Sequence, residues 1–253
     1  MVALLKQKLA TGAVNGTMVL TNAPASVEML GYAGFDYAII DTEHGANDIA
    51  EVESMVRAAE VSGLTAMVRV TKNDPAYILR AMDVGARGVL VPQVNSAAEA
   101  ERAVRAVKYY PRGDRGLAGI VRAARYGFLP LDRYIADSND NTLVIVQAED
   151  IKAFAALDKI LAVDGVDGVF VGPADLSHSM AMPGRFDDPE FTRIVHAIVD
   201  RTVKSGKIAG MFCFDAAQAK YWRGLGVRML CVGTDTMMFA GAARTMAREL
   251  KGN

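Results

Sequence analysis

The stretch YAIIDTEHGANDIAEVESMVRAAEVSG, residues 37–63, carries the pattern that decides the fold. Its apolar run at 37–40 is typical of a buried strand, and apolar residues at helical spacing follow it and close at Gly63. Between the strand and the helix stand Asp41, Glu43 and His44. A strand that ends in titratable side chains usually ends in a pocket, so this exit is a candidate functional site.

The same strand–helix unit recurs along the chain. Helical patterns of similar length separate short β-rich runs, which are residues 17–21, 37–41, 65–70, 88–93, 142–149, 168–172, 207–214 and 228–233. Eight such units predict an α/β fold of the (β/α)8 TIM barrel type, as a single domain over residues 1–253. An open doubly wound sheet is the alternative, but its GxGxxG fingerprint after the first strand is missing.

Length and composition fit one soluble barrel. A chain of 253 residues that is 51% hydrophobic can bury a large core. The net charge of -1, with scattered Lys and Arg, argues against nucleic acid or an anionic membrane as partner. No segment nears the roughly 18 apolar residues of a membrane span, and residues 1–12 lack an export signal, so we expect a cytoplasmic protein. Cys213 and Cys231 lie in apolar runs, which predicts buried thiols and excludes a thiolate metal site.

The connection over residues 109–141 is much longer than the two to six residues typical of such folds. Long loops on barrels usually cover or complete a site. Arg122 and Arg125 in this segment are candidates either for contact with a polar acceptor substrate or for ion pairs across a subunit interface.

Polar side chains stand at the exits of several predicted strands. Arg69 closes TAMVRV, Gln147 and Glu149 close LVIVQAE, and Asp175 follows GVFVGPA. Because the C-terminal ends of barrel strands meet at one face, these residues are expected to converge with Asp41 and His44. Glu149 and Asp175, one unit apart, are two hard oxygen ligands, which suggests Mg²⁺ or Mn²⁺ with positions left open for water and substrate.

A 2-oxo acid suits this predicted site. A helix beginning near Pro173 offers free amides at Ala174 and Asp175 to a carboxylate. Arg69 could stabilise the enolate of the acid, and His44, its ring oriented by Asp41, could serve as acid or base.

Plainer interpretations exist for each residue. Asp41 and Glu43 could form a salt bridge or cap the helix near Asn47, and Glu149 or Asp175 could merely favour a helix N-terminus. The prediction of a functional site would fail only if all of these plainer interpretations were correct at once.

Other reactions also fit a barrel. A Schiff-base aldolase needs a lysine in the pocket, whereas Lys72 is in a loop and Lys207 opens its strand at the wrong face. A phosphosugar isomerase or epimerase is a second alternative, because Gly233 follows the eighth run where barrels often bind phosphate. A non-catalytic barrel is a third.

Several motifs occur together in one order: DTEHG at 41–45, MVRV at 67–70, VPQV at 91–94, YYPRGDRG at 109–116, VQAED at 146–150 and VDGVFVGPADLS at 166–177. In these motifs the chain resembles the HpcH/HpaI family of metal-dependent class II pyruvate aldolases, such as 4-hydroxy-2-oxoheptanedioate aldolase, over about residues 15–245. The resemblance implies a (β/α)8 barrel that forms and cleaves 4-hydroxy-2-oxo acids from pyruvate, or a close 2-oxo acid such as hydroxypyruvate, and an aldehyde. It also implies a Mg²⁺, Mn²⁺ or Co²⁺ cofactor with no organic cofactor, and a hexamer built as a trimer of dimers that exchange the last helix.

Residue roles follow from the same resemblance. It implies metal ligands at Glu149 and Asp175, an enolate stabiliser at Arg69, and an acid/base at His44 with Asp41 beside it. It implies a contact from Gln147 to substrate or to metal-bound water. The residues themselves add Ala174, Asp175, Phe212 and Arg122 as candidate substrate contacts. Two departures concern the pocket: Ala148 is small, and Phe212 replaces the usual aliphatic residue, which predicts a narrower or differently shaped acceptor site.

Overall fold

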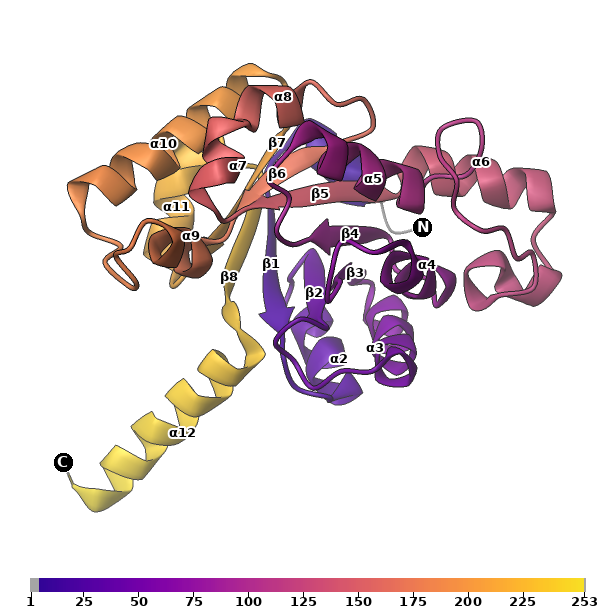
Figure 1. Ribbon diagram of the computed structural model, residues 1–253. Coiled ribbons are helices and arrows are strands. Elements are labelled where there is room, and N and C mark those ends of the chain that lie inside the picture. Colours follow the sequence, from indigo (N-terminus) through magenta and orange to yellow (C-terminus); the bar gives the residue numbers. More distant parts are fainter. Residues whose placement is uncertain (1–4, 253) are drawn as a thin grey trace.

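The computed structural model describes residues 5–252 and contains a closed barrel of parallel strands in sequence order (Figure 1). The strands are β1 (Val14–Val19), β2 (Tyr37–Asp41), β3 (Thr65–Arg69), β4 (Gly88–Val91), β5 (Leu143–Ala148), β6 (Gly168–Val171), β7 (Ile208–Cys213) and β8 (Met229–Thr234). The (β/α)8 prediction is therefore confirmed. The first strand begins three residues before the predicted one, at Val14.

Helices follow the strands and form an outer layer around most of the barrel. They are α1 (Leu5–Thr11), α2 (Pro24–Tyr32), α3 (Ile49–Ser62), α4 (Pro75–Asp83), α5 (Ala97–Val107), α6 (Leu131–Asn141), α7 (Ile151–Ala155), α8 (Leu157–Leu161), α9 (Pro173–Ser179), α10 (Pro189–Lys204), α11 (Ala216–Gly224) and α12 (Asp235–Lys251), with a 3₁₀ helix η1 (Arg122–Gly127). Their ends carry the expected signals. The side chains of Asp74, Ser96 and Asp188 accept first-turn amides, and Gly63 closes α3 in the left-handed conformation.

The barrel interior is filled by alternate strand residues, because successive side chains of a strand point to opposite faces. Tyr37, Ile39, Met67, Ile145 and Phe170 are completely or almost completely buried and belong to one interior cluster. Leu5 and Leu9 of α1 join this cluster from the N-terminal end of the barrel. The same alternation places the last residues of β2 and β3 over this apolar interior, and there the side chains become charged.

The long connection after α5 is irregular over residues 108–121 and then partly helical, and it does not cover the strand-end site of its own barrel. It contains η1 and α6, and it returns the chain to the beginning of β5. Lys108 donates to the carbonyls of Asn139 and Thr142, and Arg87 pairs with Asp137, which fixes α6 beside the N-terminal ends of β4 and β5. The expectation that it covers the site is wrong within this chain, because helix-to-strand connections lie at the end of the barrel opposite the site.

Helix α12 projects away from the barrel (Figure 1). Its base is anchored by Asp235, whose carboxylate accepts the amides of Leu20 and Thr21 at the end of β1. Beyond that base its large apolar residues are exposed: Met237, Met238, Phe239, Met246 and Leu250. Within residues 5–252, no helix has the length and hydropathy needed to cross a membrane.

Candidate active site

Asp41 and Arg69 meet at the C-terminal ends of β2 and β3, where they are partners in the parallel register. Arg69 donates from Nε to Oδ1 of Asp41 at 2.9 Å and from Nη2 to Oδ2 at 2.5 Å. Asp41 is completely buried and Arg69 nearly so. Burial opposes the charge of Arg69, yet the hydrogen bonds and the charge of Asp41 raise its pKa above the ordinary value. The guanidinium is thus charged and held in one orientation.

Asp41 also organises the turn that follows β2. Its Oδ1 accepts the backbone amides of Glu43 at 3.0 Å and His44 at 3.3 Å, and Asn47 Nδ2 donates to its carbonyl at 2.8 Å. A Cβ on Gly45 would lie 2.4 Å from the Asp41 carbonyl oxygen, so the turn requires glycine there. Asp41 therefore fixes the backbone of His44. That Asp41 orients the His44 ring stays a prediction; within residues 5–252, the hydrogen bonds of its carboxylate go to Arg69 and to backbone amides.

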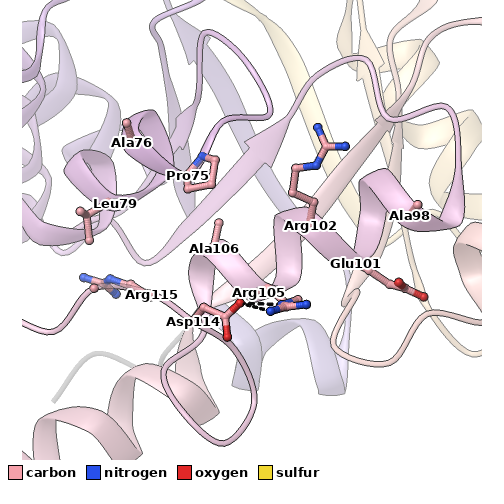
Figure 2. A pocket seen from close by; sticks show the side chains of 11 residues that line it. Pro75, Ala76, Leu79, Ala98, Glu101, Arg102, Arg105, Ala106, Asp114 and Arg115 are labelled. Carbon is pink, nitrogen blue, oxygen red and sulfur yellow. Dashed lines mark hydrogen bonds and ion pairs between the residues drawn. The ribbon is translucent and has the colours of Figure 1, made fainter.

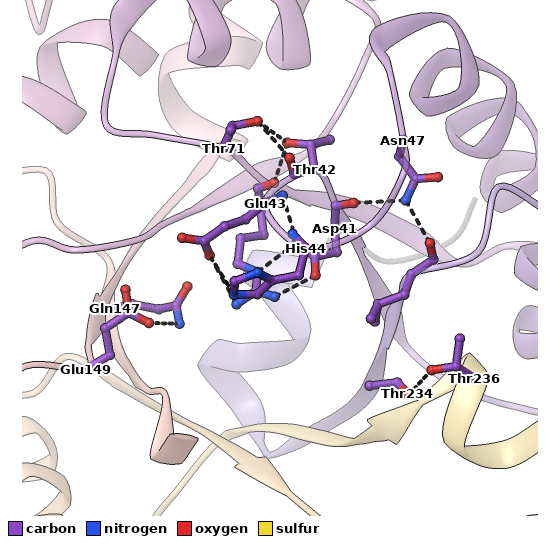
Figure 3. A network of polar contacts seen from close by, with 12 residues as sticks. Asp41, Thr42, Glu43, His44, Asn47, Thr71, Gln147, Glu149, Thr234 and Thr236 are labelled. Atoms are coloured by element: carbon purple, nitrogen blue, oxygen red, sulfur yellow. Dashed lines mark hydrogen bonds and ion pairs between the residues drawn. The ribbon is translucent and has the colours of Figure 1, made fainter. Parts of the chain in front are cut away.

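Glu43 is a site residue for which the sequence analysis found no functional role (Figure 3). Its Oε2 lies 3.2 Å from Nη1 of Arg69 and 4.0 Å from Nε2 of His44. The Glu43 side chain is 12% exposed, whereas that of His44 is 59% exposed. Burial raises the pKa of Glu43 to about 6, and the charges of Asp41 and Asp175 add to this while Arg69 opposes it. The motif DTEHG contains Glu43 beside His44, but the sequence analysis assigned Glu43 only to a salt bridge or a helix cap.

Gln147 and Glu149 stand at the exit of β5. Gln147 donates from Nε2 to Oε2 of Glu149 at 2.6 Å, and the backbone amide of Gln93 donates to Oε1 at 2.7 Å. Gln93 has φ of 55°, a left-handed conformation that is strained for a side chain and typical of functional sites. Burial raises the pKa of Glu149 to about 7, and the charges of Glu43 and Asp175 add to the rise, while the Gln93 amide opposes it.

Asp175 and Ala174 lie in the first turn of α9, which follows β6. Asp175 is exposed and is not the N-cap, which is Gly172. Its charge acts on both Glu43 and Glu149, so the three carboxylates face one region. One plainer interpretation was that Glu149 only favours the N-terminus of the helix after β5. The N-cap of that helix is Asp150, whose side chain accepts the amide of Lys152, whereas Glu149 is directed to the site.

The donor set fits a divalent cation that keeps open positions. In the described part of the chain, no cluster of three His, Cys, Asp or Glu residues could enclose a metal. Glu149 and Asp175 instead offer carboxylates from adjacent strand exits, and Oε1 of Gln147 is buried without a hydrogen-bond partner. A cation beside Glu149 would stabilise its charged form, which burial and the neighbouring charge of Asp175 disfavour. Two carboxylates with further sites for water and substrate suit Mg²⁺ or Mn²⁺.

Phe212 lies near the strand-end residues, whereas Arg122 does not. Phe212, on β7, is half-buried, packs on the interior cluster and contacts Phe214 edge-on at 5.3 Å between ring centroids. It therefore lies near the barrel mouth. Arg122 binds Glu60 at 2.5 Å and the Val84 carbonyl at 2.9 Å. Within a single chain the structure does not bring Arg122 to the strand-end residues.

Two pockets lie outside the strand-end site. One, of about 460 Å³, lies between α4 and α5 beside the Arg105–Asp114 ion pair (Figure 2). The other, of about 450 Å³, includes Arg122 and the residues before β3 and β4. Neither is lined by the strand-end residues described above, so the candidate site rests on the convergence of side chains rather than on cavity size.

Comparison with known proteins gives consistent matches. The family profile described as HpcH/HpaI aldolase/citrate lyase matches residues 16–242. A hydroxypyruvate/pyruvate aldolase of Agrobacterium fabrum is 40% identical over 90% of this chain and 85% of its own length. A 2-keto-3-deoxy-L-rhamnonate aldolase of Klebsiella pneumoniae is 35% identical over the same shares. The crystal structure of an HpcH/HpaI aldolase/citrate lyase family protein from Burkholderia cenocepacia is 32% identical and covers 98% of both chains with a TM-score of 0.92.

Proposed function

Because the chain belongs to the HpcH/HpaI aldolase/citrate lyase family and is an aldolase, a carbon–carbon lyase, we propose that its strand-end residues form the active site of this reaction. The substrates are 4-hydroxy-2-oxo acids, which are cleaved to pyruvate, or to a close 2-oxo acid such as hydroxypyruvate, and an aldehyde. The named activities of the relatives support this substrate class.

We propose that Glu149 and Asp175 hold the divalent cation, with Gln147 directed to substrate or to a bound water. When bound, Mg²⁺, Mn²⁺ or Co²⁺ would supply a Lewis acid for the carbonyl of the 2-oxo acid. The amides of Ala174 and Asp175, in the first turn of α9, are suited to the substrate carboxylate.

Arg69 is assigned to stabilise the oxygen that gains negative charge during the reaction. When the bond between C3 and C4 breaks, its electron pair moves to C3 and gives the enolate, whose charge lies largely on the C2 oxygen. A guanidinium already held by Asp41 through two hydrogen bonds needs no reorganisation to meet this charge. Preorganised donors of this kind typically contribute about 10²- to 10³-fold in rate.

His44 is assigned to proton transfer. In cleavage, the C4 hydroxyl must lose its proton as the aldehyde forms, and C3 must gain one to give the methyl group of pyruvate. The His44 ring is an exposed group beside the buried carboxylates, and an imidazole has one nitrogen that can accept a proton and one that can donate it. Phe212 at the barrel mouth is assigned to the wall that the aldehyde meets.

The convergence of Asp41, Arg69, Glu43 and Glu149 at one barrel end carries this assignment. Its test is dialysis against a chelator, followed by addition of Mn²⁺, Co²⁺ or Mg²⁺. Cleavage and exchange of the pyruvate methyl protons in deuterated water should be lost and then restored. Activity that persists in the metal-free protein would overturn the cation assignment.

The rival reactions have less support. Lys207 donates from Nζ to the carbonyls of Val163 and Val166, before β6, and is therefore unavailable for a Schiff base at the strand ends. A phosphosugar isomerase finds no support among the relatives described above. Borohydride trapping with pyruvate should therefore give no covalent adduct.

Assembly and location complete the proposal. We propose a cytoplasmic hexamer built from dimers that exchange α12. The projecting helix and its exposed apolar residues are compatible with such an exchange.

A further inference from the structure

One oxygen of Glu43 faces two of the groups assigned to the chemistry. Oε2 is 3.2 Å from Nη1 of Arg69 and 4.0 Å from Nε2 of His44. Figure 3 shows Glu43 and His44 in this network. This oxygen is buried and has no hydrogen-bond partner among residues 5–252. A buried carboxylate oxygen normally has a partner, so this one has acceptor capacity left for a mobile donor.

Asp41 already binds other donors. Its Oδ1 accepts Nε of Arg69 and the amides of Glu43 and His44, and its Oδ2 accepts Nη2 of Arg69. Its side chain is completely buried below the turn. The exposed ring of His44 therefore meets the carboxylate of its neighbour in sequence, Glu43, and not that of Asp41.

We propose that Glu43 is a positioning residue for the aldol reaction: it holds the outer nitrogen of Arg69 and orients the ring of His44 through Nε2. This inference rests on the proposed roles of Arg69 and His44. A separation of 4.0 Å is an ion-pair distance and too long for a hydrogen bond. Catalytic hydrogen bonds are often long in a ligand-free site and shorten when substrate is bound, and a ring as exposed as that of His44 can turn to close the gap.

The charged groups around Glu43 come from four elements. Arg69 reaches it from β3, Asp41 from the end of β2, Glu149 from the exit of β5 and Asp175 from α9. Arg69 is the cation among them, so Glu43 gains a paired environment only on the Arg69 side. The imidazole ring of His44 lies beside the same oxygen, Oε2, and a proton on Nε2 would give this oxygen a second positively charged partner.

The test uses the full-length protein loaded with Mn²⁺ and the variants Glu43→Gln and Glu43→Asp. Measured quantities are the kcat and KM of cleavage, the exchange rate of the pyruvate methyl protons, and the affinity for Mn²⁺ by electron paramagnetic resonance. Glu43→Gln should lower kcat and the exchange rate about 10- to 100-fold, as loss of an orienting partner typically does. KM for the 2-oxo acid and Mn²⁺ affinity should change less than about threefold.

Glu43→Asp keeps the charge and should lie between the wild type and Glu43→Gln. In a double-mutant cycle, Glu43→Gln should cost less activity once His44→Asn is present, because one of the two groups that it positions is gone and only Arg69 remains. Glu190→Gln, which breaks an exposed ion pair with Arg193 on α10, is the matched control and should behave as the wild type.

The inference is overturned if Glu43→Gln keeps wild-type exchange, if it lowers Mn²⁺ affinity in parallel with kcat, or if its cost is unchanged beside His44→Asn. Glu43→Asp no better than Glu43→Gln would overturn the role of the charge. Failure of the proposed function is distinguishable, because then the wild-type protein itself would not exchange the methyl protons of pyruvate.

Discussion

At the scale of single residues, the site is a set of charges that the barrel mouth forces together. Asp41 and Arg69 neutralise one another in a nearly water-free position. Glu43 and Glu149 are only partly compensated, and burial is the main reason that the pKa of each is raised. One pair therefore has a structural and electrostatic role, and the remaining carboxylates are suited to bind a cation and a substrate.

Arg69→Lys tests the planar fork of the guanidinium. Lysine keeps the charge but cannot donate in parallel to both oxygens of Asp41 and also reach Glu43. We expect kcat to fall about 10²- to 10³-fold, measured by coupled assay of pyruvate release, while the protein still unfolds cooperatively.

Arg87→Lys is the control for this substitution, because Arg87 pairs with Asp137 at the other end of the barrel. If Arg69→Lys lowered the free energy of unfolding but left kcat unchanged, the pair would be structural and the assignment of Arg69 to the enolate would fail.

Glu149→Gln tests the pH dependence of the metal-free protein. The pKa of Glu149 is raised from 4.5 to about 7, so the folded state favours the protonated acid. That contribution to stability is complete below pH 4.5 and is lost as pH rises through about 7. Relative to Glu149→Gln, the wild-type free energy of unfolding should therefore fall over this window, by at most about 1.4 kcal/mol per pH unit.

Urea denaturation in chelator at several pH values measures this difference. Saturating Mg²⁺ should then stabilise the wild type above pH 7 much more than it stabilises Glu149→Gln, because a ligand that binds the folded state adds to its stability. Parallel pH curves for the two proteins would contradict the assignment of a raised pKa to Glu149.

At the scale of elements, the exits of β5 and β6 have to approach closely for their polar groups to share one region. The glycine between β6 and α9 permits this approach. A Cβ on Gly172 would lie 2.9 Å from Nε2 of Gln147 and 3.0 Å from Oε2 of Glu149. The absent side chain leaves the space that these two groups occupy.

Gly172→Ala should therefore displace Gln147 and Glu149 without breaking the barrel. We expect Mn²⁺ affinity to fall about 10-fold or more, measured by titration calorimetry, since shifts of groups around a metal typically have that effect. Gly224→Ala is the control, because a Cβ there meets no atom within 4 Å. Equal Mn²⁺ affinity in Gly172→Ala and the wild type would show that the ligand set lies elsewhere.

At the scale of the whole molecule, the barrel closes on itself and leaves α12 outside. A 17-residue helix that exposes Phe239, Met246 and Leu250 to water lacks the apolar partner that stabilises most protein helices. A second copy of the chain, exchanging the same helix, would provide that partner.

Phe239→Asp should accordingly reduce the size of the particle, measured by light scattering after size-exclusion chromatography. Phe239 is 79% exposed in the single chain, so the substitution leaves the barrel core intact. Lys220→Asp, an exposed charge change on α11, should leave the size unchanged. A monomeric wild-type protein, or a Phe239→Asp protein of wild-type size, would exclude assembly through this part of α12.

The sequence by itself determined the barrel, because eight apolar runs alternating with amphipathic helices permit few other closed arrangements. It also determined that Arg69, Gln147, Glu149 and Asp175 stand at strand exits, since that depends only on where each apolar run stops.

Only the tertiary structure decided which of these groups meet. The parallel register pairs Asp41 with Arg69, and this pairing withdraws Asp41 from the His44 ring and leaves Glu43 facing it. The sequence likewise did not predict that Gln93, in a left-handed conformation, donates its amide to Glu149, or that Arg122 lies far from the site. Contacts of this kind depend on strand stagger and turn geometry, which residues distant in the sequence set jointly and no local pattern encodes.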